Sequence, residues 1–107
     1  MGTLQSVTDR TFEEKVLKAE GTVIVDFWAV WCPPCRALEP VLEQLAADHP
    51  EITIVKVNAD DEIDTAKDYR VTSMPTITVF RDGEVVSTLI GARPKAALEH
   101  ALAPYLG

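Results

Sequence analysis

The sequence contains two cysteines, Cys32 and Cys35, separated by only two residues. They follow an apolar segment and open a run with helical periodicity, so the first sulfur should lie at a helix N-terminus. There, free N–H groups and the helix dipole stabilise a thiolate. Cys35 lies one turn later on the same face, near enough to form a disulfide and deeper in the helix. We therefore predict that Cys32 is a nucleophile and Cys35 a resolving thiol.

Three other uses of the two cysteines compete with this one. A zinc site needs about four ligands, and the two histidines, His49 and His100, lie far along the chain on unrelated elements. A cysteine hydrolase would need one of these histidines as its base, but both are more typical of solvated helix faces. Two inert buried cysteines remain possible, although the helix-start position argues against them. A purely structural bridge over so small a loop would add only about 2 kcal/mol, so we expect thiol chemistry and no metal.

One carboxylate, Asp26, interrupts residues 22–28, which are otherwise nearly all apolar or β-branched. Burial penalises the ionised form of a carboxyl, so the pKa of Asp26 should be raised. It can then hold a proton near neutral pH.

The strands that position these residues are predicted from apolar runs and turn residues. Residues 22–28 and 52–57 are typical of buried strands, and residues 3–7 of an edge strand. Residues 76–80 and 84–90 predict a hairpin with a tight turn at Asp82 and Gly83.

Helices are predicted between and after these strands. Thr11 and Glu14 match a capping box before a short helix, and Pro34 should occupy the first turn of a longer one, which Pro40 should kink. A third helix lies in the acidic stretch 60–68, and Pro94 opens the last. The apolar residues that mark these helices are Phe12, Val16, Leu38, Val41, Leu42, Leu45, Ile63, Ala66, Tyr69, Ala97, Leu98, Ala101, Leu102 and Tyr105, with those of the last helix facing the core.

The predicted order is βαβαβαββα, which indicates an α/β fold with a mixed sheet and helices on both faces. The strand order within the sheet does not follow from the sequence. A length of 107 residues fits one domain covering residues 1–107.

Charge argues against two classes of partner. Ten basic and 17 acidic side chains give a net charge of −7, which disfavours nucleic acid and anionic membranes. We found no apolar run of 18 residues and no leader pattern, so a cytoplasmic location is expected. The acidic residues Asp60, Asp61, Glu62 and Asp64 only partly match a calcium loop and are expected to be a solvated face.

A set of short motifs spans the chain in order with characteristic separations. These are Asp26-Phe27-Trp28-Ala29, Trp31-Cys32-Pro33-Pro34-Cys35-Arg36, Pro40, Met74-Pro75-Thr76 and Gly91. Together they resemble the thioredoxin family over essentially the whole chain. The resemblance implies a central five-stranded sheet flanked by four helices, with the disulfide at the end of the second strand. It also implies that Pro75 is cis and places Met74 beside the reactive sulfur.

The resemblance further implies a cytoplasmic, monomeric protein-disulfide reductase. Asp26 would assist proton transfer at the resolving thiol with Lys56 as its neighbour, although a purely structural Asp26–Lys56 pair is the alternative. Trp31, Pro33 and Pro34 would form the active-site loop. The substrate would dock on Trp28, Trp31, Met74, Pro75, Gly91 and Ala92.

The partners implied are proteins that contain disulfides and a separate thioredoxin reductase, which passes electrons from NADPH. No cofactor would be bound to this chain, because it has no glycine-rich nucleotide motif.

One residue departs from the family pattern: Pro33 stands where most members have glycine. A second proline stiffens the loop and removes an N–H near the sulfur, which should favour the disulfide and make the dithiol a stronger reductant. The alternatives are a disulfide oxidase or isomerase with an altered potential, and a non-redox module that binds partners.

Overall fold

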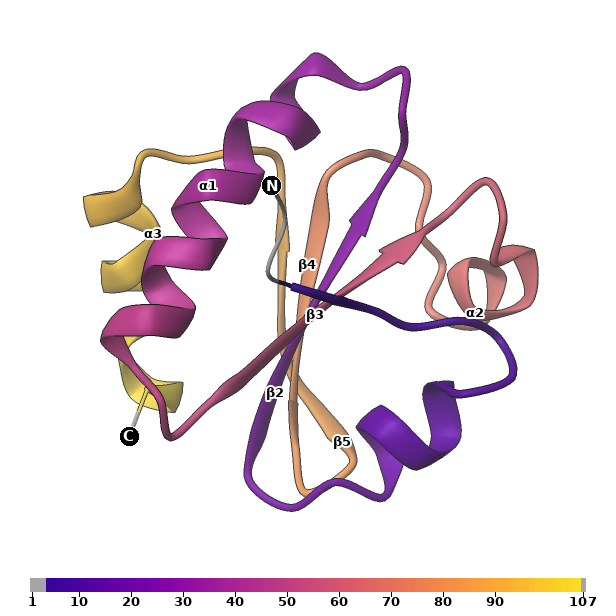
Figure 1. Ribbon diagram of the computed structural model, residues 1–107, viewed down its shortest axis with the longest axis horizontal. Coiled ribbons are helices and arrows are strands. Elements are labelled where there is room, and N and C mark those ends of the chain that lie inside the picture. Colours follow the sequence, from indigo (N-terminus) through magenta and orange to yellow (C-terminus); the bar gives the residue numbers. More distant parts are fainter. Residues whose placement is uncertain (1–3, 107) are drawn as a thin grey trace.

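The computed structural model describes residues 4–106, and its strands form one mixed sheet in the order β1-β3-β2-β4-β5 (Figure 1). Strands β1, β3 and β2 run parallel, whereas β4 is antiparallel to β2 and β5 to β4. This confirms the five-stranded mixed sheet with helices on both faces. The elements are β1 (Gln5–Ser6), η1 (Glu13–Leu17), β2 (Thr22–Trp28), α1 (Pro33–Asp48), β3 (Thr53–Asn58), α2 (Ile63–Asp68), β4 (Thr76–Arg81), β5 (Glu84–Ile90), α3 (Lys95–Leu102) and η2 (Ala103–Tyr105).

Strand β2 lies at the centre of the sheet. It pairs with β3 along residues 23–28 and with β4 along residues 22–27. Its first six residues are buried, as expected for a strand covered on both faces. The chain leaves this strand directly into the loop that carries Cys32, so the loop begins from a buried strand that is paired on both sides.

The two faces of the sheet are covered by different helices. Helices α1 and α3 lie on one face, and η1 and α2 lie on the other (Figure 1). Alternation along β2 divides its side chains between them: Ile24 packs in the core under α1 and α3, and Val25 packs in the core beside η1. By the same alternation, Asp26 lies on the α1 side.

The hairpin between β4 and β5 turns at Asp82 and Gly83. Both residues have positive φ, 51° and 84°, as a two-residue turn of this kind requires. Arg81 and Glu84 are paired across the turn, which confirms the predicted hairpin. Gly83 also packs against the backbone of Leu17 in η1, so closely that a Cβ at this position would overlap the Leu17 carbonyl oxygen.

Three local predictions were wrong. The Thr11 hydroxyl accepts a hydrogen bond from the Thr8 amide instead of forming a capping box with Glu14, and a single π-helical turn follows with no side-chain cap. Ala97 is exposed, because Leu98 and Leu102 fill the core on that side. The edge strand is shorter than predicted, since β1 contains only Gln5 and Ser6; Thr3 lies outside the described residues.

Helix α1 continues through Pro40 to Asp48. None of the helices in residues 4–106 is long and apolar enough to cross a membrane.

Candidate active site

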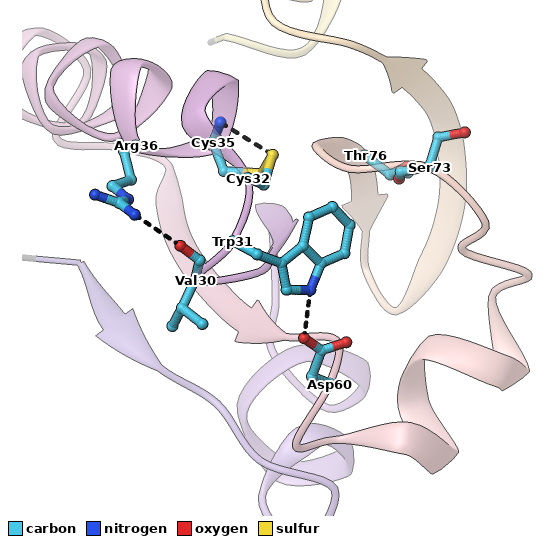
Figure 2. The surroundings of a disulfide bond; sticks show 8 residues. All are labelled: Val30, Trp31, Cys32, Cys35, Arg36, Asp60, Ser73 and Thr76. Atoms are coloured by element: carbon cyan, nitrogen blue, oxygen red, sulfur yellow. Dashed lines mark hydrogen bonds between the residues drawn. A yellow bond between two sulfur atoms is a disulfide. The ribbon is translucent and has the colours of Figure 1, made fainter.

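The two cysteines form a disulfide at the N-terminus of α1 (Figure 2). Their Cα atoms are 5.3 Å apart, and the residues are only 3% and 2% exposed. Cys32 is the N-cap residue, with extended backbone, and Cys35 is the first residue of α1 after the two prolines. The bridge therefore joins the point where the loop ends to the first turn of the helix.

The hydrogen bonds at this helix start centre on Cys32. The Cys35 amide donates to the Cys32 Sγ at 3.3 Å, and the Cys32 carbonyl oxygen accepts from the amides of Cys35 and Arg36. An N-cap side chain accepts from the second or third amide of a helix, and Pro34 at the second position has no N–H, so the Cys35 amide is the donor to the sulfur. A helix-terminal amide facing a sulfur stabilises its thiolate.

The loop before the cysteines is held from both sides. Arg36 donates from Nη2 to the Val30 carbonyl oxygen at 3.0 Å, and the Cys32 amide donates to the Ala29 carbonyl oxygen at 3.2 Å. Trp31 is 61% exposed, but its Nε1 donates to Asp60 Oδ2 at 2.7 Å (Figure 2). An exposed indole with a fixed orientation thus lies next to a buried disulfide.

A second loop approaches the sulfurs from the other side. The Met74–Pro75 bond is cis, as the resemblance implied. Met74 and Trp28 are both partly buried and pack against a cluster of Ala29, Cys32 and Cys35. The structure therefore brings Met74 and Trp28 to the disulfide.

The remaining residues of the expected docking surface, Gly91 and Ala92, lie next to the loop that contains Pro75. The Gly91 amide donates to the Pro75 carbonyl oxygen at 2.9 Å, which joins the end of β5 to the cis proline. Ala92 follows and is exposed. Thr76 donates from its hydroxyl to the Ser73 carbonyl oxygen at 2.6 Å, which closes the turn before β4.

Asp26 is buried in the centre of the sheet. It is 2% exposed, and its Oδ1 has no hydrogen-bond partner. Burial, followed by the nearby charge of Glu39, raises the pKa of Asp26 to about 7, and the charge of Lys56 opposes this shift. A carboxyl with such a pKa can take up or release a proton at neutral pH.

Lys56 occupies the position next to Asp26 on β3, as their paired register shows. Its ion pair, however, is with Glu39: Nζ lies 2.8 Å from Glu39 Oε2. The same ammonium lies 5.3 Å from the centre of the Trp28 ring. Lys56 is therefore a neighbour of Asp26 whose direct contact is with a different carboxylate.

The histidines lie away from the sulfurs. His49 caps the far end of the 16-residue helix α1, where its ring nitrogens contact Glu51 at 3.6 Å and Glu99 at 3.5 Å. His100 is exposed on α3. Within residues 4–106, no three His, Cys, Asp or Glu side chains are grouped as a metal site would need.

Sequence reasoning missed two residues of the site. Glu39 follows Cys35 by four residues, a spacing that places both on one face of a helix and could have indicated it. Asp60 is exposed, as expected for a solvated face, and it also accepts the Trp31 hydrogen bond, which was not predicted. No sequence signal links residues 31 and 60, because the contact joins loops after two neighbouring parallel strands.

A disulfide that closes so small a ring adds little to the stability of the fold. Because it also lies where a thiolate is favoured, the Cys32–Cys35 disulfide is suited to being formed and reduced repeatedly. That chemistry places the chain among the thiol–disulfide oxidoreductases.

Comparison with known proteins identifies the group within that class. The thioredoxin family model matches residues 3–104. A thioredoxin of Streptomyces clavuligerus is 54% identical over 97 residues, which cover 91% of this chain and 91% of that protein. Thioredoxin 1 of Synechococcus elongatus is 41% identical over 107 residues, or 99% of this chain and 100% of its own. A thioredoxin of Rhodospirillum rubrum is 48% identical, with 89% and 92% covered.

The chain belongs to the thioredoxin family. It is a thiol–disulfide oxidoreductase that reduces protein disulfides, and its redox centre is the Cys32–Cys35 pair.

Proposed function

We propose that Cys32 is the attacking thiolate and Cys35 the resolving thiol in the reduction of protein disulfides. The observation that carries this assignment is the hydrogen bond from the Cys35 amide to the Cys32 Sγ at the start of α1. Such a donor lowers the pKa of the sulfur it faces and so increases the thiolate fraction.

The reaction has two exchanges. The Cys32 thiolate attacks one sulfur of the substrate disulfide, and the other substrate sulfur leaves with the bonding electron pair. Cys35 then gives its proton to the Asp26 carboxylate and attacks the Cys32 Sγ. The bond between Cys32 and the substrate breaks, so the substrate gains two electrons and the two cysteines become the disulfide.

The substrate would bind as an extended segment on the surface around the sulfurs. Support comes from the exposed Trp31 ring, from Met74 beside the cluster of the cysteines, and from the Gly91 amide bound to the Pro75 carbonyl oxygen. Such a surface suits main-chain pairing with side chains on either side. This protein would act as a monomer in the cytoplasm, and a separate thioredoxin reductase would restore the dithiol with electrons from NADPH.

The test is to trap the first intermediate. Cys35→Ser keeps the nucleophile but lacks the resolving thiol, so after incubation with insulin it should accumulate a mixed disulfide, seen as an intact-mass adduct. Cys32→Ser is the matched control and should give none, while the unaltered dithiol should reduce insulin to completion. Equal adducts on both variants would contradict the assignment of roles.

The reduction potential separates the alternatives. A value near or below about −270 mV, measured against graded dithiothreitol buffers, supports a reductase, whereas about −150 mV supports an oxidant or isomerase. If partner function survives replacement of both cysteines by serine, the chain is a binding module instead.

A further inference from the structure

The Lys56 ammonium is held by two groups on the α1 side of the sheet. Glu39 Oε2 lies at 2.8 Å, and the Trp28 ring centre lies at 5.3 Å. The Lys56 and Glu39 side chains are only 16% and 26% exposed, so water screens the pair less than it would at the surface. This is a directed contact and not a loose surface pair.

Asp26 lies in the same row of the sheet. Lys56 on β3, Asp26 on β2 and Ile77 on β4 are register partners, so their side chains leave the same face side by side, about 5 Å apart. A lysine one strand away from a buried carboxylate is its obvious ionic partner. Yet Asp26 Oδ1 has no hydrogen-bond partner, and the Lys56 Nζ contacts Glu39.

Three elements surround this row. Lys56 comes from β3, Glu39 and Cys35 come from α1, and β4 contributes the uncharged Ile77. The two charges act on Asp26 in opposite directions: Glu39 raises its pKa and Lys56 lowers it, with Glu39 the larger of the two. A carboxylate at position 39 therefore adds its own repulsion and also occupies the cation that would otherwise neutralise Asp26.

We propose that Glu39 is a positioning residue for the exchange reaction: it holds the Lys56 ammonium, so that Asp26 keeps no ionic partner and can exchange a proton with Cys35. This inference rests on the proposed role of Asp26 in the second exchange. The proton leaves the Cys35 sulfur for an Asp26 oxygen as the Cys35–Cys32 bond forms and the bond to the substrate sulfur breaks. Without Glu39, Lys56 pairs with Asp26 and makes it a weaker base.

The test follows the Asp26 side-chain carboxyl directly. Its 13C resonance is titrated in the oxidised protein, where the cysteines do not ionise. Glu39→Gln should lower the Asp26 midpoint by about one pH unit or more. Lys56→Gln should raise it, and the double variant Glu39→Gln/Lys56→Gln should return it close to the unaltered value. Glu20→Gln removes the same charge from an exposed position before β2 and should leave the midpoint unchanged.

Kinetics provide the second readout. The rate of the second exchange is followed by stopped flow, from a preformed mixed disulfide, as a function of pH. In Glu39→Gln the acid limb of this pH–rate profile should move to lower pH by the same amount as the Asp26 midpoint. Its rate at the plateau should fall severalfold, because a weaker base accepts the proton less readily.

Two results would overturn the proposal. One is an Asp26 midpoint that does not move in Glu39→Gln while Glu39→Gln still folds and reduces insulin. The other is a shift of the same sign in both single variants, which would indicate a general packing change. If the unaltered protein itself fails to reduce insulin, the proposed function fails, whereas the titration still reports on the Glu39–Lys56–Asp26 coupling.

Discussion

The Asp26 carboxyl lies in the core with one oxygen unpartnered, and its pKa is raised from 3.8 to about 7. Between these two values the folded chain binds a proton that the unfolded chain has lost. Stability therefore falls as the pH rises from about 4 to about 7, and the full cost is present above pH 7. Three pK units correspond to on the order of 4 kcal/mol. A residue this unfavourable for folding is consistent with a role in proton transfer.

Replacing Asp26 with asparagine removes the charge but keeps the shape. The variant Asp26→Asn should be more stable than the unaltered protein by about 2 to 4 kcal/mol at pH 8 and nearly equal to it at pH 4. Urea unfolding of the oxidised proteins at both pH values measures the difference. An equal gain at the two values would indicate a packing effect instead of an ionisation.

At the scale of an element, the start of α1 explains what Pro33 contributes. The Cys32 Sγ accepts its hydrogen bond from the Cys35 amide, at the third helical position. Pro33 occupies the first helical position, whose amide does not reach an N-cap side chain. Having proline at position 33 therefore removes no hydrogen-bond donor from the sulfur. Of the two effects expected of Pro33, only the stiffening of the loop remains. It limits the conformational freedom of the loop when the two cysteines are reduced.

Substituting Pro33 with glycine isolates that stiffness. Pro33→Gly should make the reduction potential less negative by about 10 to 20 mV, since proline restriction is worth about 0.4 to 1 kcal/mol. Equilibration with dithiothreitol buffers measures the change, and the Cys32 thiol pKa should stay constant because no donor is gained. A more negative potential would contradict the assignment of stiffness to Pro33.

Elements defined by neighbouring residues could be predicted from the sequence, and contacts between elements could not. The bounds of β2 and β5 were predicted correctly, because apolar runs bounded by turn residues define them locally. The disulfide and helix start were also predictable, since both depend on neighbours within four residues. The ion pair of Lys56 with Glu39 was not predictable, because it depends on which helix lies over Asp26 and Lys56 in the sheet. The predicted Thr11 cap was wrong because the Thr11 hydroxyl accepts its hydrogen bond from the Thr8 amide, which precedes it in the chain.

At the scale of the whole molecule, the β4–β5 turn ties the end of the sheet to the first part of the chain. The Gly21 amide donates to Asp82 Oδ1 at 2.8 Å, and the Asp82 amide donates to the Gly21 carbonyl oxygen at 3.0 Å. Gly83 packs on the Leu17 backbone. These contacts join segments about 60 residues apart at the end of the sheet opposite the disulfide.

Two glycines at this end form a matched pair. Gly21 and Gly83 have φ of 81° and 84°, but an added Cβ meets open space at Gly21 and the Leu17 backbone at Gly83. Gly21→Ala should cost about 1 kcal/mol from backbone strain, and Gly83→Ala should cost about 1 to 3 kcal/mol more from overpacking. Urea unfolding measures both, and equal losses would show that the turn moves away from η1 without cost.

The central position of β2 affects how slowly its amide protons exchange with solvent. Its backbone is paired with β3 on one side and β4 on the other along nearly its whole length. Amide protons in such a strand exchange with solvent only through the rarest, most extensive openings of the fold. We therefore expect the amides of β2 to be among the last to exchange. The two sulfurs can then be oxidised and reduced while the strand that carries their loop stays closed.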